Sequence, residues 1–435
     1  MKIWSLLLAV LLLSGCSMRT VDQLYCLPKR SEEYNDLQSV IDRHMGQMSY
    51  CAPLSGENPQ SVQLADLDGD GVGEYILFAK GSAERPLQIL IFRLGPEGYI
   101  LSDTIESTGS AFDIVEYARI DDQLGVELVV GVQVSDQVAR SVSVYRFFDG
   151  KAQSVLSTNY TRFLSWDMDA DGRGDLVVLR PGESDGSAGV AQMYSYRSGI
   201  MERSNEVDLS GTVDKMKRVV AGKLQDGVPA VYVASAVDES SIITDVFALV
   251  DGMFANVSFS SESGTGVQTQ RNYYIYADDI DGDGVMELPK LLTMISPSNA
   301  PLPERQYLIR WSAMDATGQM HPKAHSFHNY EGGWYLDLDS GWAERVAVLQ
   351  RGDAFEFFLW DEDFGQAQKL LTVYAFTGED REALSVLDNR AVLYESEETI
   401  YSVYLEVASA SYGLTQEKLE RSFHLIHADW KTGET

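Results

Sequence analysis

Short apolar segments recur along most of the chain, and glycine and aspartate separate them. β-branched and aromatic residues in runs of this length favour strands, whereas Gly, Asp and Asn favour the turns between strands. The pattern therefore predicts an all-β body of many short strands. The clearest strand predictions cover Leu87–Leu94, Ser141–Phe148, Val190–Tyr196, Thr244–Val250 and Gln306–Ser312.

Two segments have helical rather than strand periodicity. Leu37, Ile41 and Met45 recur every four residues, which places them on one face of a helix ahead of the β body. Leu419 and Phe423 do the same near the end of the chain. We therefore expect one short helix at each end of the body.

An acidic loop recurs three times, at residues 66–74, 167–175 and 279–287. Each copy reads Asp-x-Asp-x-Asp-Gly-x-x-Asp/Glu. The starts are 101 and 112 residues apart, about twice a unit of fifty-odd residues. Intermediate units are present, but they begin with Arg119 and Lys223 in place of the first aspartate.

Each unit has room for four strands, which is the content of a propeller blade. A single open sheet of so many strands would expose long unpaired edges, whereas blades arranged in a ring leave only short ones. The sequence therefore predicts a β-propeller over residues 55–412. Six to eight four-stranded blades fit the spacing, and seven fit it best.

The acidic loops have the chemistry of a calcium site. Ca²⁺ takes six to eight oxygen ligands, and alternate carboxylates on a tight loop can supply several of them. The candidate ligands in the first loop are Asp66, Asp68, Asp70, the Val72 carbonyl and Glu74. Those in the second loop are Asp167, Asp169, Asp171, the Arg173 carbonyl and Asp175. Those in the third loop are Asp279, Asp281, Asp283, the Val285 carbonyl and Glu287.

Charge repulsion favours a bound ion over an empty acidic turn. Two like charges 4 Å apart cost about 4 kcal/mol at an effective dielectric constant of about 20. A solvated Asp/Gly turn explains one such loop but explains three in register poorly. We therefore expect about three structural Ca²⁺ ions. Arg119 and Lys223 either supply a side-chain cation in place of the metal or mark simple loss of the loop.

The three acidic loops and their spacing resemble the FG-GAP/VCBS repeats of integrin-type β-propellers. The resemblance implies that the metal hairpins lie on the face opposite the main ligand surface. A protein or carbohydrate partner would then bind the second-to-third strand loops. Two such loops stand out, Pro181–Gly189 and Ile295–Glu304.

The first residues predict export and membrane anchoring. An apolar run, Ile3–Leu13, is too short to span a bilayer and suits a secretory signal. It leads into Leu-Ser-Gly-Cys, which resembles a bacterial lipobox and implies cleavage before an acylated Cys16. We assign 1–15 to a lipoprotein signal peptide, 16–54 to a tether and N-terminal helix, and 413–435 to a C-terminal helix and tail. Cys26 and Cys51 are then either a disulfide or two free thiols.

The composition reduces the number of function classes that fit the chain. A net charge of −31 excludes nucleic acid as a partner, because phosphate binding requires clustered Lys and Arg. His321, His325 and His328 are interpreted as part of an exposed loop rather than a metal site. No catalytic set can be identified among so many acidic residues. The leading hypothesis is an extracytoplasmic, lipid-anchored, calcium-binding propeller that serves as a binding platform. The alternatives are a propeller enzyme acting on a polysaccharide or peptide, and an envelope assembly lipoprotein.

Overall fold

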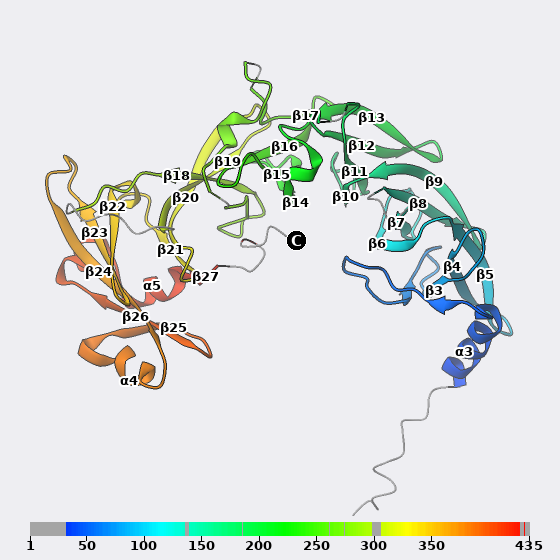
Figure 1. The fold of residues 1–435 in the computed structure, drawn as a ribbon, viewed down its shortest axis with the longest axis horizontal. Coiled ribbons are helices and arrows are strands. Elements are labelled where there is room, and N and C mark those ends of the chain that lie inside the picture. The colour runs from blue at the N-terminus through cyan, green and yellow to red at the C-terminus, as the bar shows by residue number, and fades with distance from the viewer. Residues whose placement is uncertain are drawn as a thin grey trace, which may run out of the picture.

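The computed structural model describes residues 32–134, 139–184, 186–260, 262–273, 275–297, 306–426 and 430. These residues form an all-β propeller of antiparallel sheets that are built mainly from consecutive strands. In Figure 1 the sheets follow one another along an arc, from the first (blue) to the last (orange), with a gap between them. The described residues form six sheets, so the structure has one fewer than the seven that the spacing favoured.

The first three sheets contain thirteen strands. Sheet 1 contains β1 (Ser49–Tyr50), β2 (Val62–Ala65), β3 (Glu74–Lys80), β4 (Leu87–Gly95) and β5 (Gly98–Ser107). Sheet 2 contains β6 (Ala111–Ala118), β7 (Glu127–Gln133), β8 (Arg140–Phe148) and β9 (Lys151–Tyr160). Sheet 3 contains β10 (Arg162–Trp166), β11 (Asp175–Arg180), β12 (Val190–Arg197) and β13 (Ile200–Asp208).

The remaining strands complete sheets 4 to 6. Sheet 4 contains β14 (Met216–Lys223), β15 (Pro229–Ala236), β16 (Ile242–Val250) and β17 (Met253–Asn256). Sheet 5 contains β18 (Glu287–Leu292), β19 (Gln306–Met314), β20 (Met320–Asn329), β21 (Trp334–Leu338) and β27 (Phe423–Leu425). Sheet 6 contains β22 (Val346–Arg351), β23 (Ala354–Trp360), β24 (Ala367–Thr377), β25 (Ala391–Glu395) and β26 (Thr399–Leu405).

Helices are few and short. The α-helices are α3 (Glu32–Met45), α4 (Arg381–Ser385) and α5 (Gln416–Ser422). The 3₁₀ turns are η1 (Val213–Lys215), η2 (Val267–Thr269), η3 (Ala343–Arg345), η4 (Leu387–Asn389) and η5 (Val407–Tyr412). The predicted N-terminal and C-terminal helices correspond to α3 and α5.

The five strand predictions from the apolar pattern are confirmed by β4, β8, β12, β16 and β19. Two features differ from the expected pattern of repeats. Residues 275–277, ahead of the third acidic loop, are irregular where the first two loops follow a strand, and Asp278 forms an isolated bridge with Glu287. The three histidines lie on strand β20 rather than in an exposed loop, and His328 is fully buried there.

Apolar side chains from facing sheets form the core between each sheet and the next. Phe78 of sheet 1 meets Phe112 of sheet 2 with ring centroids 5.0 Å apart. Phe327 of sheet 5 meets Phe357 of sheet 6 at 5.1 Å. Each buried side chain of this size contributes about 1.5–3 kcal/mol. The array is therefore held together through its sheet faces, one junction at a time.

The two ends of the array are covered differently. On sheet 1, Leu37, Val40 and Ile41 of α3 pack against the face that is turned away from sheet 2. On sheet 6, Glu356 pairs with Lys369 at 3.3 Å, whereas Phe376 and Ile400 are buried outside the core that this sheet shares with sheet 5. Helix α4 contacts the strands β24 and β26 of this end sheet, so each end of the array has a helix against it.

The end of the chain returns from sheet 6 to sheet 5. Strand β27 pairs with β21 and becomes the fifth strand of that sheet. Trp430 follows and is buried against Trp311, His328 and Tyr335, with ring centroids 5.6–5.9 Å apart. Burial lowers the pKa of His328 to about 3, so this histidine is neutral beneath the indole. Phe423 of β27 also meets Tyr401 of sheet 6 with ring centroids 4.9 Å apart, so the C-terminal segment contacts both sheets 5 and 6.

Candidate metal centre

The three acidic loops occupy equivalent places in their sheets. The first connects β2 to β3, the second connects β10 to β11, and the third leads into β18. Each ends in an acidic residue that begins a buried strand: Glu74, Asp175 or Glu287. A rigid strand therefore holds one carboxylate of each loop, while the turn presents the others.

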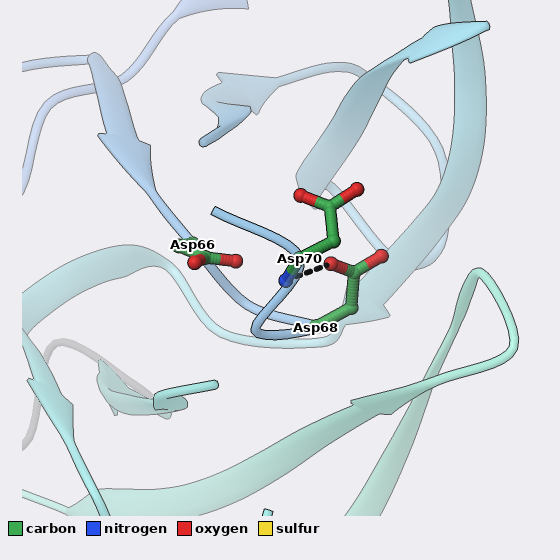
Figure 2. A group of neighbouring side chains, drawn as sticks. All are labelled: Asp66, Asp68 and Asp70. Carbon is green, nitrogen blue, oxygen red and sulfur yellow. Dashed lines mark hydrogen bonds between the residues drawn. The ribbon is translucent and has the colours of Figure 1, made fainter. Parts of the chain in front are cut away.

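Backbone hydrogen bonds shape the first loop. The Asp66 carboxylate accepts the N–H groups of Gly69 at 2.8 Å and Gly71 at 2.9 Å. The Asp68 carboxylate accepts the N–H of Asp70 at 3.2 Å, the bond drawn in Figure 2. Gly69 and Gly71 have positive φ angles of 74° and 87°, which glycine adopts without steric cost. The tight turn brings the three aspartates of Figure 2 around one small volume.

The second and third loops keep the bond from the sixth loop residue to the first aspartate and the bond from the third aspartate N–H to the second aspartate. They differ from the first loop in one bond, which comes from the fifth loop residue instead of the fourth. Asp167 accepts the N–H groups of Asp171 and Gly172 at 3.0 and 2.9 Å. Asp279 accepts the equivalent bonds from Asp283 and Gly284 at 3.0 and 2.9 Å. The three loops therefore share one backbone geometry, which is more than a shared composition.

The last acid of each loop is buried and bonded inward. Glu74, Asp175 and Glu287 accept the N–H of the second loop residue at 2.8, 3.0 and 3.1 Å. Burial, with neighbouring loop aspartates adding repulsion, raises the pKa of Glu74 to about 7, of Asp175 to about 6 and of Glu287 to about 7. Within the described residues, no cation is among the groups that shift the pKa of these carboxylates, and a divalent ion would supply the positive charge.

Three carboxylates converge in each loop, with ligand atoms within 4.8 Å of one another. The groups are Asp66 with Asp68 and Asp70, Asp167 with Asp169 and Asp175, and Asp279 with Asp281 and Glu287. The other predicted carboxylates lie outside these groups. Glu74 bonds Leu67, Asp171 pairs with the Arg173 guanidinium, and Lys323 approaches Asp283 at 3.4 Å. The carbonyls of Val72, Arg173 and Val285 stay predicted ligands.

The third loop provides a direct test of whether its residues fit a cation. Glu287 is 0 % exposed, and its Oε2 accepts the Ile280 N–H. Its Oε1 is buried and has no hydrogen-bond partner in the described structure. A buried carboxylate oxygen without a partner is costly, and a Ca²⁺ ion held between Glu287, Asp279 and Asp281 would satisfy it.

A fourth loop keeps the geometry without the metal ligands. In sheet 2, Glu127 is buried and accepts the N–H groups of Ile120 at 2.6 Å and Asp121 at 3.2 Å. Asp121 is buried and pairs with Arg146 of β8 at 3.5 Å. Arg119 itself is exposed. The side-chain cation of this loop is therefore Arg146 of β8 and not the predicted Arg119. Nothing in the loop sequence indicates Arg146.

Neighbouring loops are joined to one another by backbone hydrogen bonds. The N–H groups of Val126, Gly174 and Met286 donate to the carbonyl of the first residue in the preceding loop. Those acceptors are Asp66 at 3.1 Å, Arg119 at 2.6 Å and Lys223 at 2.9 Å. The donor is seven residues beyond the loop start each time. The acidic loops therefore sit at the junctions between sheets 1 and 2, 2 and 3, and 4 and 5.

Of the three cysteines for which acylation or a disulfide was predicted, only Cys51 lies among the described residues. Cys51 is half-buried, whereas Cys16 and Cys26 lie outside the described residues, so acylation and the disulfide stay predictions. In the described part of the chain, no helix has the length and apolar character needed to cross a membrane.

Comparisons with known proteins give only distant likenesses. No family model and no curated protein matches the chain. Rhamnogalacturonan lyase from Bacillus licheniformis matches with 13 % identity over 80 % of this chain and 86 % of its own, at a TM-score of 0.30. Chaetomium thermophilum Sqt1, bound to the N-terminus of a ribosomal protein, has 10 % identity over 80 % and 98 %, at 0.31. TolB from Acinetobacter baumannii has 10 % identity over 78 % and 69 %, at 0.25. Superpositions this loose carry no argument about function.

Proposed function

We propose that the protein is a calcium-stabilised, lipid-anchored propeller that presents a binding surface outside the cytoplasm. The observation that carries the calcium site is the convergence of three carboxylates in each of three loops with one shared hydrogen-bond pattern. Carboxylate oxygens on a tight turn suit Ca²⁺, and extracellular modules bind it at about 10⁻⁴–10⁻³ M. The resemblance to FG-GAP/VCBS repeats supports the same assignment.

The ions would stabilise the junctions between sheets. Each acidic loop contributes a backbone group to a bond with the next or the preceding loop. An ion that fixes the loop also fixes that bond, so calcium stiffens the array at three junctions. The role is structural, because the shared geometry lies in the loop itself and not around a substrate cleft.

The binding surface would lie at the opposite edge of the sheets. There the second strand of each sheet turns into the third, as in the loop of 181–189 between β11 and β12. The Ile295–Glu304 loop lies largely outside the described residues. Protein or carbohydrate is the partner class that we propose for this edge. The lipobox at Cys16 supports anchoring to a bacterial membrane, with the propeller held outside the cytoplasm.

The calcium site is tested by Glu287→Gln, which keeps the shape of the side chain and removes its charge. We expect calcium to raise the melting temperature of the wild-type protein. At the same calcium concentration, the rise in the variant should be smaller than in the wild-type protein by roughly one third, because only the third of the three loops loses an ionised ligand. Thermal unfolding across a calcium titration measures this.

Glu127→Gln is the matched control, because Glu127 occupies the same place in a loop without a metal group. It should change stability by the same amount with and without calcium. Identical calcium dependence of the two variants would contradict the third site. No calcium effect on the wild-type protein would contradict all three.

A further inference from the structure

Exposed apolar residues occupy one repeated position, the tip of the hairpin between the third and fourth strands. They are 44–67 % exposed, although most residues of their type are buried elsewhere in the chain. We call them the tip residues: Leu94 and Ile100 in sheet 1, Phe148 in sheet 2, Ile200 in sheet 3 and Met253 in sheet 4. Repetition on four consecutive sheets distinguishes them from isolated surface apolar residues.

A cation stands directly across the hairpin from three of these residues. The register pairs Arg93 with Ile100, Lys151 with Phe148, and Arg197 with Ile200. Of these cations, Lys151 also pairs with Asp103 at 3.0 Å. The whole chain carries a charge of −31, so a basic residue at each of three successive tips runs against its composition. Apolar side chains flanked by cations are typical of protein surfaces that lie in the membrane interface.

The tips share an edge with the acidic loops. In an antiparallel sheet the first-to-second and third-to-fourth connections lie at the same end of the strands. Contacts confirm this, because Tyr196 and Arg197 line a cavity of about 200 Å³ together with Asp169 of the second loop. Adjacent hairpins also touch, since the Ser102 hydroxyl donates to the Gly150 carbonyl at 2.8 Å. Strands β5, β9 and β13 run along the outside of the arc in Figure 1.

The N-terminal helix begins at this same edge. The Asp36 carboxylate, near the start of α3, accepts the N–H of Tyr99 at 3.2 Å, beside the tip of sheet 1. The helix then crosses the sheet, because Ser49 pairs with Lys80 at the opposite edge. The start of α3, the helix that follows the predicted tether in the sequence, therefore lies on the side of the tip residues and the acidic loops.

We infer that the tip residues rest on the lipid surface to which Cys16 is anchored, an inference that rests on the proposed lipid anchor. The acidic loops would repel anionic headgroups, and Glu97, Asp149 and Asp251 at the turns add to this. Bound calcium offsets that repulsion, so contact with the membrane depends on calcium. The opposite edge then faces away from the membrane and is free to bind a partner.

The test uses the full lipidated protein in vesicles of phosphatidylcholine with phosphatidylglycerol. In a Cys26→Ser, Cys51→Ser background, an environment-sensitive fluorophore is attached at Ile200→Cys or Met253→Cys. Val237→Cys is the matched control, because Val237 is an exposed apolar residue in the turn between β15 and β16, at the opposite edge. With calcium, nitroxide-labelled lipid should quench the two tip labels at least about threefold more strongly than the control. A chelator should abolish most of that difference.

The outcomes separate the anchor from the orientation. Failure of the protein to float with vesicles would overturn the lipid anchor, and the inference with it. Flotation with equal quenching at residues 200 and 237 would overturn the orientation alone. Tip labels that stay in water until another protein is added would show that the tips are a protein-docking surface, which also overturns the inference.

Discussion

Replacing Gly125 with alanine should open the junction between sheets 1 and 2. A methyl group at this position would lie 2.2 Å from the Leu67 carbonyl oxygen, which is backbone and cannot move aside by a rotamer change. The loops must separate, and the bond from the Val126 N–H to the Asp66 carbonyl is lost with them. We expect the free energy of unfolding to fall by about 3 kcal/mol or more. Backbone amides should also exchange faster in sheet 1 than in sheets 5 and 6.

Gly211→Ala provides the comparison for that variant. The nearest atom to its added methyl group is the Ser235 Cβ at 3.9 Å, an ordinary contact distance. Its stability should therefore change by less than about 1 kcal/mol. Equal urea midpoints for the two variants would show that close approach of the loops does not hold this junction.

Trp430→Ala should release the C-terminal segment from sheet 5. The indole is buried and stacks on His328 and Tyr335. Truncating a buried tryptophan costs about 3–5 kcal/mol, since the cavity that is left closes only in part. Exchange of β27 amides should rise together with that of β21, its neighbour in the sheet.

Trp360→Ala serves as the matched substitution. Trp360 is half-buried on sheet 6, and its indole N–H donates to the Ile295 carbonyl at 2.8 Å. Trp360→Ala should therefore lower the free energy of unfolding by less than half as much as Trp430→Ala. If Trp360→Ala lowered the free energy of unfolding more than Trp430→Ala, Trp430 would not be the residue that holds the C-terminal segment in place.

The repeated acidic loops and the strand runs could be predicted because they depend on residues close together in the sequence. Asp66 and Gly69 form their contacts within one turn, so their spacing alone indicates the geometry. The five-strand form of sheet 5 could not be predicted, because His424 of β27 lies 89 residues beyond its partner Tyr335. A three-residue strand has too little periodicity to indicate such pairing.

Contacts between residues distant in the sequence could not be predicted either. Arg146 of β8 reaches Asp121, in the loop between β6 and β7, because the strands of sheet 2 fold together, and nothing in the loop indicates which cation will pair with it. The bonds that join neighbouring loops had no signal in side-chain type, because their N–H donors are residues as different as Val126, Gly174 and Met286. The open arc has the same cause, since unit spacing fixes the number of strands but not whether the first and last sheets meet.

Calcium binding at the acidic loops is the central claim, and titration calorimetry of the full chain tests it most directly. The three carboxylate groups predict uptake of three ions at calcium concentrations of about 10⁻⁴–10⁻³ M. A variant with Asp66→Asn, Asp167→Asn and Asp279→Asn should bind none. Absence of calcium uptake by the wild-type protein at millimolar concentration, or equal uptake by the variant, would contradict the account.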